Sequence, residues 1–430
     1  MALGGGVFTT QNKTLPGAYI NFVNATRAVS DISSRGVAAI MLPFDWAPEE
    51  KLFSVTAEDF RYHSIKVFGK SYDDDSLKDV REVFRHATRV YFYNALTGGA
   101  AATSKYGTAK NPGIKGNDLK VVVTAAIGGG FNVETYLGAV LVDTQTVSDK
   151  SAVKDNDYIS FNISTALAAD AGTAFTGGKN GTTTTETHTK FMTALENVSF
   201  NILACTSDDA TVQSTYIAFT KRMRDEYGVK FQTVIPYSAG VKADYEGVIA
   251  SSQAKLVPWL AGAEAGCLAS ESCTNMIYDG ELMTADEVSV TQADLTAGIE
   301  AGELMFHRVG DQIRVLTDID TLVTYTDTKS KAFASNQAMR VLDQIGNDIA
   351  TIFNDRYVGT APNNEAGRVA FWNEVVQYIN DLQAAGAVQN FRSEDVTVTR
   401  GNTDADAVAT LNVQPVNAFE RLYMTVYIGQ

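Results

Sequence analysis

The chain has 430 residues, which is enough for about three domains of roughly 150 residues each. Hydrophobic residues make up 45% and charged residues 20%, so the composition is that of a folded protein and excludes disordered and collagen-like chains. The net charge of −15 at pH 7 repels phosphate groups, so we expect neither nucleic acid nor an anionic membrane as a partner.

Membrane, export and disulfide signals are absent from the sequence. No run of about 18 apolar residues occurs, so no spanning helix and no direct membrane insertion are expected. The first residues lack a basic segment followed by an apolar one, so no signal peptide is expected and we expect synthesis in the cytoplasm. Cys205 lies in an apolar run typical of a core, and Cys267 and Cys273 do not make a disulfide framework; we expect reduced thiols.

The N-terminal residues 1–29 are polar and Gly-rich until the stretch GAYINFV. Pro16-Gly17 marks a turn just before it. A two-residue alternation of apolar and other side chains then predicts an isolated strand, whose residues are Tyr19, Ile20, Asn21, Phe22 and Val23.

Residues 30–95 have a mixed α/β pattern. GVAAIMLPFDW predicts a short buried strand, and RVYFYNAL predicts another. Between them, Thr56 is a candidate N-cap for a helix over TAEDFRYHSIKVFG. SLKDVREVFRHA predicts a second helix with Leu77, Val80 and Val83 on one face.

Residues 96–194 are rich in Ala, Gly and Thr, with short alternating strands between Gly and Asn turns. This pattern predicts a β-sandwich or barrel module. IGGGFN at 127–132 is interpreted as a hairpin or a bulge. The Thr-rich segment 172–191 is expected to be a long polar loop, either a hairpin tip or disordered.

Residues 195–329 alternate between strand and helix, as in a parallel sheet with crossover helices. One predicted helix begins after residue 209 and ends at Gly228. Another, over AKLVPWLAGAEAGC, is expected to be interrupted by Pro258. The stretch MFHRVGDQIRVLTDIDTLVT at 305–324 predicts an antiparallel hairpin.

Residues 330–418 predict two long helices, around 331–355 and 364–385, followed by strands. Residues 419–430 then repeat the alternation seen near the N-terminus. The residues of this predicted strand are Leu422, Tyr423, Met424, Thr425, Val426, Tyr427 and Ile428. Because an unpaired strand edge invites aggregation, this strand is expected to pair either within its own sheet or with another molecule.

Catalytic chemistry is hard to find in this sequence. GTAFTGGKN at 172–180 fails the P-loop pattern because Gly178 intervenes before Lys179 and Asn180 replaces the hydroxyl residue. No Gly-x-Ser-x-Gly elbow occurs, and neither the histidines nor the cysteines have metal-ligand spacing. We therefore predict no catalytic, cofactor or metal site and no enzyme; a hydrolase with His307 as its base is the weakest alternative.

The segments GGGVFTTQNKTLPGAYINFVN and LNVQPVNAFERLYMTVYI resemble the two termini of contractile-tail sheath proteins of phages, phage-like elements and R-type bacteriocins of Gram-positive bacteria. The order of modules fits this family along the whole chain. The resemblance implies an α/β and α+β multidomain fold. Its parts would be an N-terminal arm (1–29), an α/β segment (30–95), a β-sandwich insertion (96–194), a subtilisin-like α/β domain without the protease site (195–329), a C-terminal core domain (330–418) and a C-terminal strand arm (419–430).

The resemblance also implies a function. Subunits of this family stack as helical rings of six around a tail tube, and contraction drives the tube through a bacterial envelope. The two arms, Tyr19–Val23 and Leu422–Ile428, would add as strands to neighbouring subunits. Partners would be other copies of the chain and the tube, baseplate and tail terminator proteins, with no cofactor, in a virion tail or tail-like particle.

Two further expectations follow. The helices around 331–385 are candidates to face the tube, with possible contacts from Lys331, Arg340, Asp343 and Asp348. The alternative to a sheath is another self-assembling shell or surface protein, which would share the acidic composition without catalytic motifs. Flat sheets or closed shells in place of hollow cylinders would favour that alternative.

Overall fold

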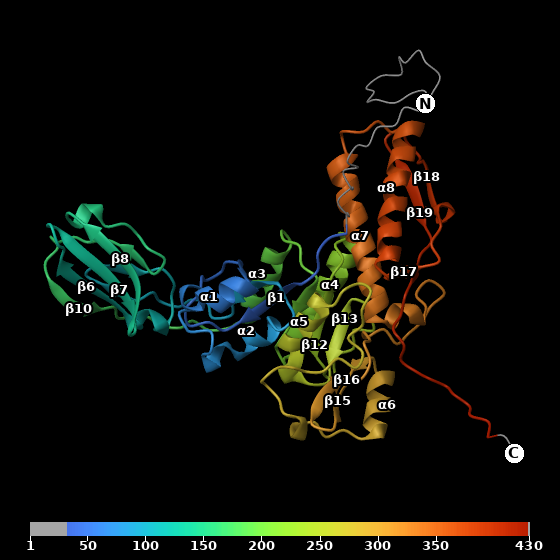
Figure 1. Ribbon diagram of the computed structural model, residues 1–430, viewed down its shortest axis with the longest axis horizontal. Helices are drawn as coiled ribbons and strands as arrows, with labels where there is room; N and C mark the ends of the chain where they lie inside the picture. The colour runs from blue at the N-terminus through green and yellow to red at the C-terminus, as the bar shows by residue number, and fades with distance from the viewer. Residues whose placement is uncertain (1–31, 429–430) are drawn as a thin grey trace, which may run out of the picture.

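The computed structural model describes residues 32–428. The predicted N-terminal strand, Tyr19–Val23, lies outside these residues and stays a prediction. Figure 1 shows three regions: a distal β module, a central α/β body, and two long helices that rise from the body beside a β-hairpin. The mixed α/β multidomain fold is as expected from the sequence.

The body contains a seven-stranded sheet in the order β14-β13-β12-β11-β1-β3-β2. All neighbours pair in parallel except β2, which is antiparallel to β3. The strands are β1 (Val37–Leu42), β2 (Phe53–Thr56), β3 (Arg89–Asn94), β11 (Ile202–Ala204), β12 (Gln232–Pro236), β13 (Val248–Ser251) and β14 (Glu303–Leu304). Segments before and after the distal module therefore share one sheet, and the predicted parallel pairing is confirmed.

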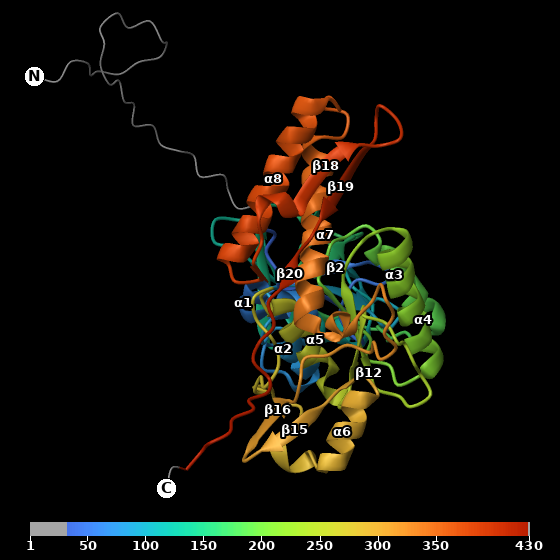
Figure 2. The ribbon, with the colours of Figure 1, turned by 90° about the vertical axis from the view of Figure 1, so that its right-hand side faces the viewer.

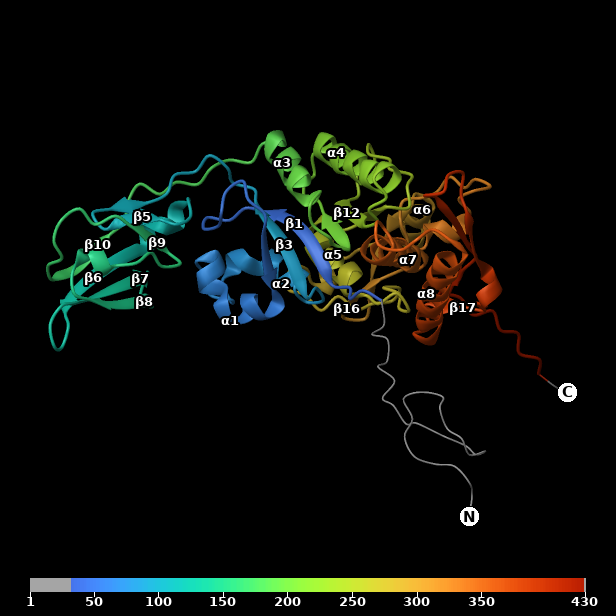
Figure 3. The same cartoon turned by 90° about the horizontal axis from the view of Figure 1, so that it is seen from above.

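Helices cover both faces of this sheet (Figure 3). On one face lie α1 (Ala57–Phe68), α2 (Lys78–Val83) and α5 (Val257–Gly266); on the other lie α3 (Thr185–Leu195) and α4 (Ala210–Lys221). Each face buries its own apolar cluster, as expected for a parallel sheet between helical layers. The body is completed by α6 (Gln292–Glu300) and by the predicted hairpin, β15 (Phe306–Val309) and β16 (Gln312–Val315).

Local sequence signals explain several helix ends. The Thr56 hydroxyl accepts a hydrogen bond from the Asp59 amide at 3.1 Å, which confirms the predicted N-cap. The expected interruption of a helix at Pro258 is wrong: this proline lies in the first turn of α5, where its missing N–H is no loss. A Cβ at Gly262 would lie 2.2 Å from the Val83 carbonyl oxygen, so the glycine allows α5 to pack closely on α2.

The distal module consists of two antiparallel sheets that share one apolar core. Its strands are β4 (Thr103–Ser104), β5 (Gly107–Ala109), β6 (Leu119–Ala125), β7 (Phe131–Leu137), β8 (Val140–Val147), β9 (Ile159–Phe161) and β10 (Asp170–Ala174). The glycines of IGGGFN make the turn between β6 and β7, as predicted. Trp46, which follows β1 in the body, is fully buried in this core and so fixes the module to the body.

The expected long polar loop at 172–191 is wrong. Thr176, Lys179 and Thr182 pair back with residues 97–103, so the two connections to the module form a narrow antiparallel ribbon. Thr184 then caps α3, whose His188, Phe191 and Leu195 are buried. These buried residues have helical spacing, but the threonines around them are β-branched and favour strands, so the sequence pattern does not indicate a helix. Packing of the buried residues against the body stabilises the helix.

The C-terminal region contains the two predicted long helices, α7 (Asn336–Arg356) and α8 (Glu365–Ala384). The strands β17 (Val388–Gln389), β18 (Val396–Arg400), β19 (Ala407–Leu411) and β20 (Gln414–Pro415) follow. β18 pairs with β19 and β17 with β20, so residues 388–415 form one long, interrupted hairpin whose first half packs on α8.

Candidate functional site

The segment 422–428 leaves the body and has no strand partner among the described residues (Figure 2). Its alternate apolar side chains are 70–92% exposed; they are Leu422, Met424, Val426 and Ile428. Tyr423 and Tyr427 are exposed as well. The segment is therefore not an edge strand of the sheets described here, although every second residue carries an apolar group suited to burial.

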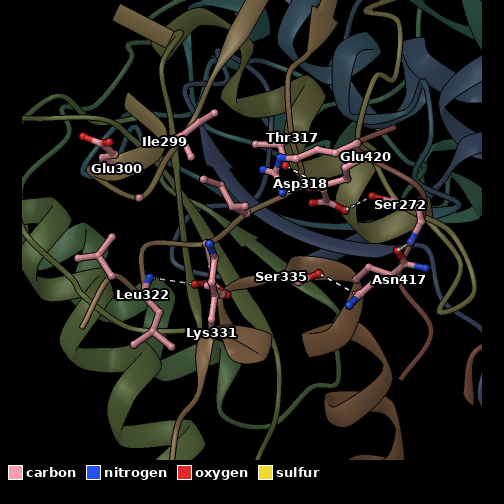
Figure 4. Close-up of a pocket in the computed structure, with 18 of the residues that line it drawn as sticks. Ser272, Ile299, Glu300, Thr317, Asp318, Leu322, Lys331, Ser335, Asn417 and Glu420 are labelled. Atoms are coloured by element: carbon pink, nitrogen blue, oxygen red, sulfur yellow. Dashed lines mark hydrogen bonds and ion pairs between the residues drawn. The ribbon is translucent and has the colours of Figure 1, made fainter. Parts of the chain in front are cut away.

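The root of this segment is held against the body. The Ala418 amide donates to Gln337 Oε1 at 2.8 Å, and the Thr317 hydroxyl donates to Glu420 Oε1 at 2.7 Å. The Thr274 hydroxyl donates to the same oxygen at 3.2 Å. Figure 4 shows Glu420 close to Thr317, beside a cavity of about 560 Å³. The chain is thus fixed to the body as far as Glu420, and residues 422–428 pair with no strand of the described part of the chain.

The hairpin β18–β19 has two open edges among the described residues. The Gly401 amide donates to the Asp406 carbonyl at 2.8 Å and the Asn412 amide to the Asp395 carbonyl at 2.9 Å. Because ladder bonds alternate along antiparallel strands, the backbone groups of Ala407 and Ala409 point away from β18.

The strand β19 was not predicted from the sequence. The signal that could have indicated it is the strand-forming run AVATL at 407–411, after the turn at Gly401.

Three of the four expected tube contacts are wrong. Arg340, Asp343 and Asp348 are buried, and only Lys331 is exposed. Arg340 binds Asp318 at 2.6 Å and also binds Glu264. Arg340 and Asp343 face the body, where their partners lie, whereas Asp348 faces α8.

Further buried polar contacts lie along α7, and together with those of Arg340 they are called the seam below. Arg224 makes a bidentate pair with Asp343 at 2.5 and 2.8 Å, and the Tyr378 hydroxyl donates to Asp348 at 2.8 Å. A paired and hydrogen-bonded charge tolerates burial, whereas a lone one does not. The seam therefore fixes the first half of α7 to the body.

The two carboxyl groups that bind Arg340, those of Glu264 and Asp318, differ in their pKa shifts. Burial raises the pKa of Glu264 well above its ordinary value, and the nearby Asp318 adds to this rise. Burial also opposes ionisation of Asp318, but Arg340 and hydrogen bonds outweigh it and lower the Asp318 pKa. The pKa values of the two carboxyl groups that bind Arg340 are therefore shifted in opposite directions.

The described residues give little support for a metal site or a catalytic site. Among the described residues, Glu264, Cys273 and Asp318 are the group whose ligand atoms lie close enough to share a cation, but Arg340 already binds both carboxyl groups. The three cysteines, Cys205, Cys267 and Cys273, are free and buried, and the expected reduced state of their thiols stays a prediction. His307 lies opposite Arg314 in the β15–β16 hairpin and has no hydrogen bond to a serine or cysteine of the described chain.

Three family models match consecutive parts of the chain. The phage tail sheath C-terminal domain matches residues 328–429, the phage tail sheath protein central domain matches 181–321, and the tail sheath protein Gp18 domain III N-terminal region matches 35–95. The phage-like element PBSX protein XkdK of Bacillus subtilis (strain 168) is 30% identical over 481 aligned residues, covering 99% of this chain and all of the relative. The chain belongs to the phage tail sheath family.

Solved structures agree with this assignment. The sheath tail protein DSY3957 of Desulfitobacterium hafniense has a TM-score of 0.77 at 32% identity, over 94% of this chain and 97% of its own. The sheath tail protein Lin1278 of Listeria innocua has a TM-score of 0.80 at 28% identity, over 90% and 93%. The anti-feeding prophage helical sheath in its contracted state shares the fold, with a TM-score of 0.53 at 12% identity over 96% and 99%.

This sheath protein is a structural component of a phage-like contractile tail and not an enzyme, as its families and relatives are tail sheath proteins. The resemblance found in its terminal segments is confirmed. None of the described helices combines the length and the apolar character needed to cross a membrane.

Proposed function

We propose that this sheath protein polymerises around a tail tube and that contraction of the polymer drives the tube through a bacterial envelope. Copies would be linked by exchanged terminal strands, Leu422–Ile428 at one end and Tyr19–Val23 at the other. The observation that carries this proposal is that one chain has both an exposed segment of alternating apolar residues and open strand edges. Two such complementary features on one molecule favour addition of a strand from one copy to the sheet of the next.

Energetics favour a polymer over an isolated pair. Burying each apolar side chain of the arm stabilises pairing by about 1.5–3 kcal/mol. Fixing the backbone of each arm residue costs about 1–2 kcal/mol. These contributions nearly cancel for one arm, so strand exchange would be stable only when many copies are linked. Because donor and acceptor surfaces differ, such contacts propagate into rings and helices instead of closing as a dimer.

Contraction would use the same links. The buried seam on α7 joins the C-terminal helices to the α/β body, so these parts would move as one unit. The arms would stay paired while these units rotate and slide. The energy would come from subunit contacts that become more extensive after contraction, with no nucleotide involved. Rings of six copies and contacts with the tube, baseplate and tail terminator proteins complete the proposal.

Negative-stain electron microscopy of the purified full-length chain tests strand exchange. The comparison is a chain truncated after Arg421, which keeps Glu420 and its bonds to Thr274 and Thr317. We expect hollow tubes from the full chain and only small particles from the truncated chain, because the truncation removes the donated strand and leaves the body intact.

A matched control replaces Ile127, an exposed apolar residue at the far tip of the distal module, with serine. This variant should form tubes as the parent does, since it removes exposed apolar surface far from either arm. Ordered tubes from the truncated chain, or dispersed monomers from the full chain at all concentrations tested, would contradict the proposal.

A further inference from the structure

Cys267 and Cys273 lie at the two ends of a short loop that follows α5. Both side chains are buried in the same apolar cluster of the body. The loop returns on itself, and a hydrogen bond joins the two thiols. The two sulfur atoms are thus neighbours in the folded chain, although the loop residues separate them in the sequence.

Residues 267–274, called the joint below, connect three parts of the molecule. Ala269 is buried in the apolar cluster of α7 and α8, whereas both cysteines belong to the cluster of the body. The Arg340 guanidinium of α7 donates to the Glu271 carbonyl at 3.0 Å. The Thr274 hydroxyl donates to the root of the C-terminal segment at 3.2 Å. A change in the joint therefore affects how the C-terminal region is held on the body.

Backbone hydrogen bonds fix the joint at both cysteines. The Cys273 amide donates to Asp318 Oδ2 at 2.9 Å. The Ser272 hydroxyl donates to the same oxygen at 3.2 Å, and Figure 4 shows Ser272 beside Asp318. At the other end, the Arg35 guanidinium donates to the Cys267 carbonyl at 2.9 Å. Because the backbone is held on both sides, the two thiols stay together in the folded chain.

The two cysteines differ in access and in acidity. Cys273 is completely buried, whereas Cys267 lines a cavity of about 460 Å³. The hydrogen bond from Cys273 lowers the pKa of Cys267, Arg340 adds to this effect, and together they outweigh burial. The same hydrogen bond and burial raise the pKa of Cys273 well above its ordinary value. Cys267 is therefore the thiol that reacts first, because the thiolate is the reactive form.

We infer that Cys267 and Cys273 are a redox-sensitive pair, which hydrogen peroxide oxidises to an intramolecular disulfide that closes the joint. This inference goes beyond the proposed function and does not depend on strand exchange. A reducing cytoplasm would keep the pair as thiols, and a particle released into an oxidising medium would form the disulfide.

The oxidation takes place in two steps. The Cys267 thiolate attacks one oxygen of hydrogen peroxide, the O–O bond breaks, and hydroxide leaves, so that Cys267 becomes a sulfenic acid. The Cys273 sulfur then attacks the Cys267 sulfur, and the hydroxyl group leaves as water with the proton of Cys273. The two thiols lose two electrons and two protons, and one hydrogen peroxide becomes two water molecules.

The disulfide would stabilise the attachment of the C-terminal region to the body. Closing a loop of the seven residues 267–273 restricts the unfolded chain and should lower the equilibrium constant of unfolding by about 50-fold. Ala269 and Glu271 lie inside the closed loop, so their contacts with the C-terminal region would be held in place as well.

Peptide analysis of the purified full-length chain tests the site. The folded chain is treated with hydrogen peroxide, and remaining thiols are blocked with N-ethylmaleimide as the chain is unfolded. Cleavage after glutamate then cuts between the two cysteines and gives the fragments Ala265–Glu271 and Ser272–Glu281. We expect these fragments as one linked species that reduction separates. Two separate, blocked fragments, or a link from either fragment to Cys205, would overturn the inference.

Three variants test the order of the steps. Cys205→Ser is the matched control, because Cys205 is buried in the cluster on the other face of the sheet, and the link should form as in the parent. In Cys273→Ser, Cys267 should stop as a sulfenic acid, which dimedone labels. We expect at least ten-fold more label there than on Cys273 in Cys267→Ser. Equal labelling of the two variants would overturn the assigned order.

Urea unfolding of the oxidised and the reduced parent tests the effect on stability. We expect an equilibrium constant of unfolding at least ten-fold lower for the oxidised chain, and no difference between peroxide-treated and untreated Cys267→Ser. An equal or higher constant for the oxidised parent would overturn the stabilising role. The chain truncated after Arg421 should form the disulfide as the full chain does, so this test and the test of strand exchange can fail separately.

Discussion

The two ends of helix α7 contrast sharply. Its first half, residues 336–348, buries charged and polar groups, and most of them have partners within the chain. At its other end, Phe353 and Val358 are exposed, and the nearby β18–β19 hairpin has open strand edges among the described residues. Groups matched within the chain hold the molecule together, whereas groups left unmatched mark the places where another molecule is expected to bind.

The contrast has a thermodynamic basis. A buried charge that loses its partner is strongly destabilising, so the seam must be complete in every copy before assembly. An open edge and an exposed ring cost little in water and stabilise only when covered. Substitutions in the seam should therefore change the free energy of unfolding, and substitutions at the tip should change assembly.

The largest effect is expected in the seam. Arg340→Met should lower the free energy of unfolding by about 3–5 kcal/mol, because Asp318 is left buried without its counter-charge. Urea unfolding followed by circular dichroism measures the loss.

Lys66→Ala provides the comparison in an exposed ion pair with Asp157. It should cost about 1 kcal/mol or less, because solvent screens exposed pairs. Similar losses for the two variants would remove the distinction between the seam and the surface.

A pair of proline substitutions in β19 sharpens the contrast at the hairpin. Val408→Pro removes a ladder hydrogen bond and should lower the free energy of unfolding by about 0.5–1.5 kcal/mol. Ala409→Pro removes an N–H that points away from β18, so it should cost less while preventing tube formation. Thermal unfolding and electron microscopy of both variants give the two readouts. Normal tubes from Ala409→Pro would mean that the β19 edge receives no strand.

The smallest effect is expected at Glu264. Because burial raises the pKa of this carboxyl group well above its ordinary value, the group should be protonated at pH 4, and Glu264→Gln should then change the free energy of unfolding by about 1 kcal/mol or less. The folded pKa lies above the unfolded value of about 4.3, so the group favours folding most at low pH, and this contribution is lost as pH rises toward the folded pKa.

The Gln variant does not titrate, so its stability relative to the parent should increase between pH 4 and pH 8. Urea unfolding at several pH values measures this trend. A relative stability that falls over the same range would show that Glu264 is ionised in the folded chain.

Patterns of short range were predictable from the sequence. The capped helix at Thr56, the parallel strands of the body and the long helices of the C-terminal region follow from residues that are neighbours in the chain. The terminal segments carried the family resemblance for the same reason. One error arose where packing outweighed local preference, at the threonine-rich start of α3. The error at Pro258 was local: the proline lies in the first turn of α5, where its missing N–H is tolerated.

The sequence by itself determined the alternation in Leu422–Ile428, because a period of two depends only on the order of residues. Only the tertiary structure decided that Arg340 is buried, since its partners Asp318 and Glu264 lie 22 and 76 residues away. The same holds for the open edges of the β18–β19 hairpin. Periodicity is set by the neighbours of a residue in the chain, whereas burial and exposure are set by distant segments that fold against it.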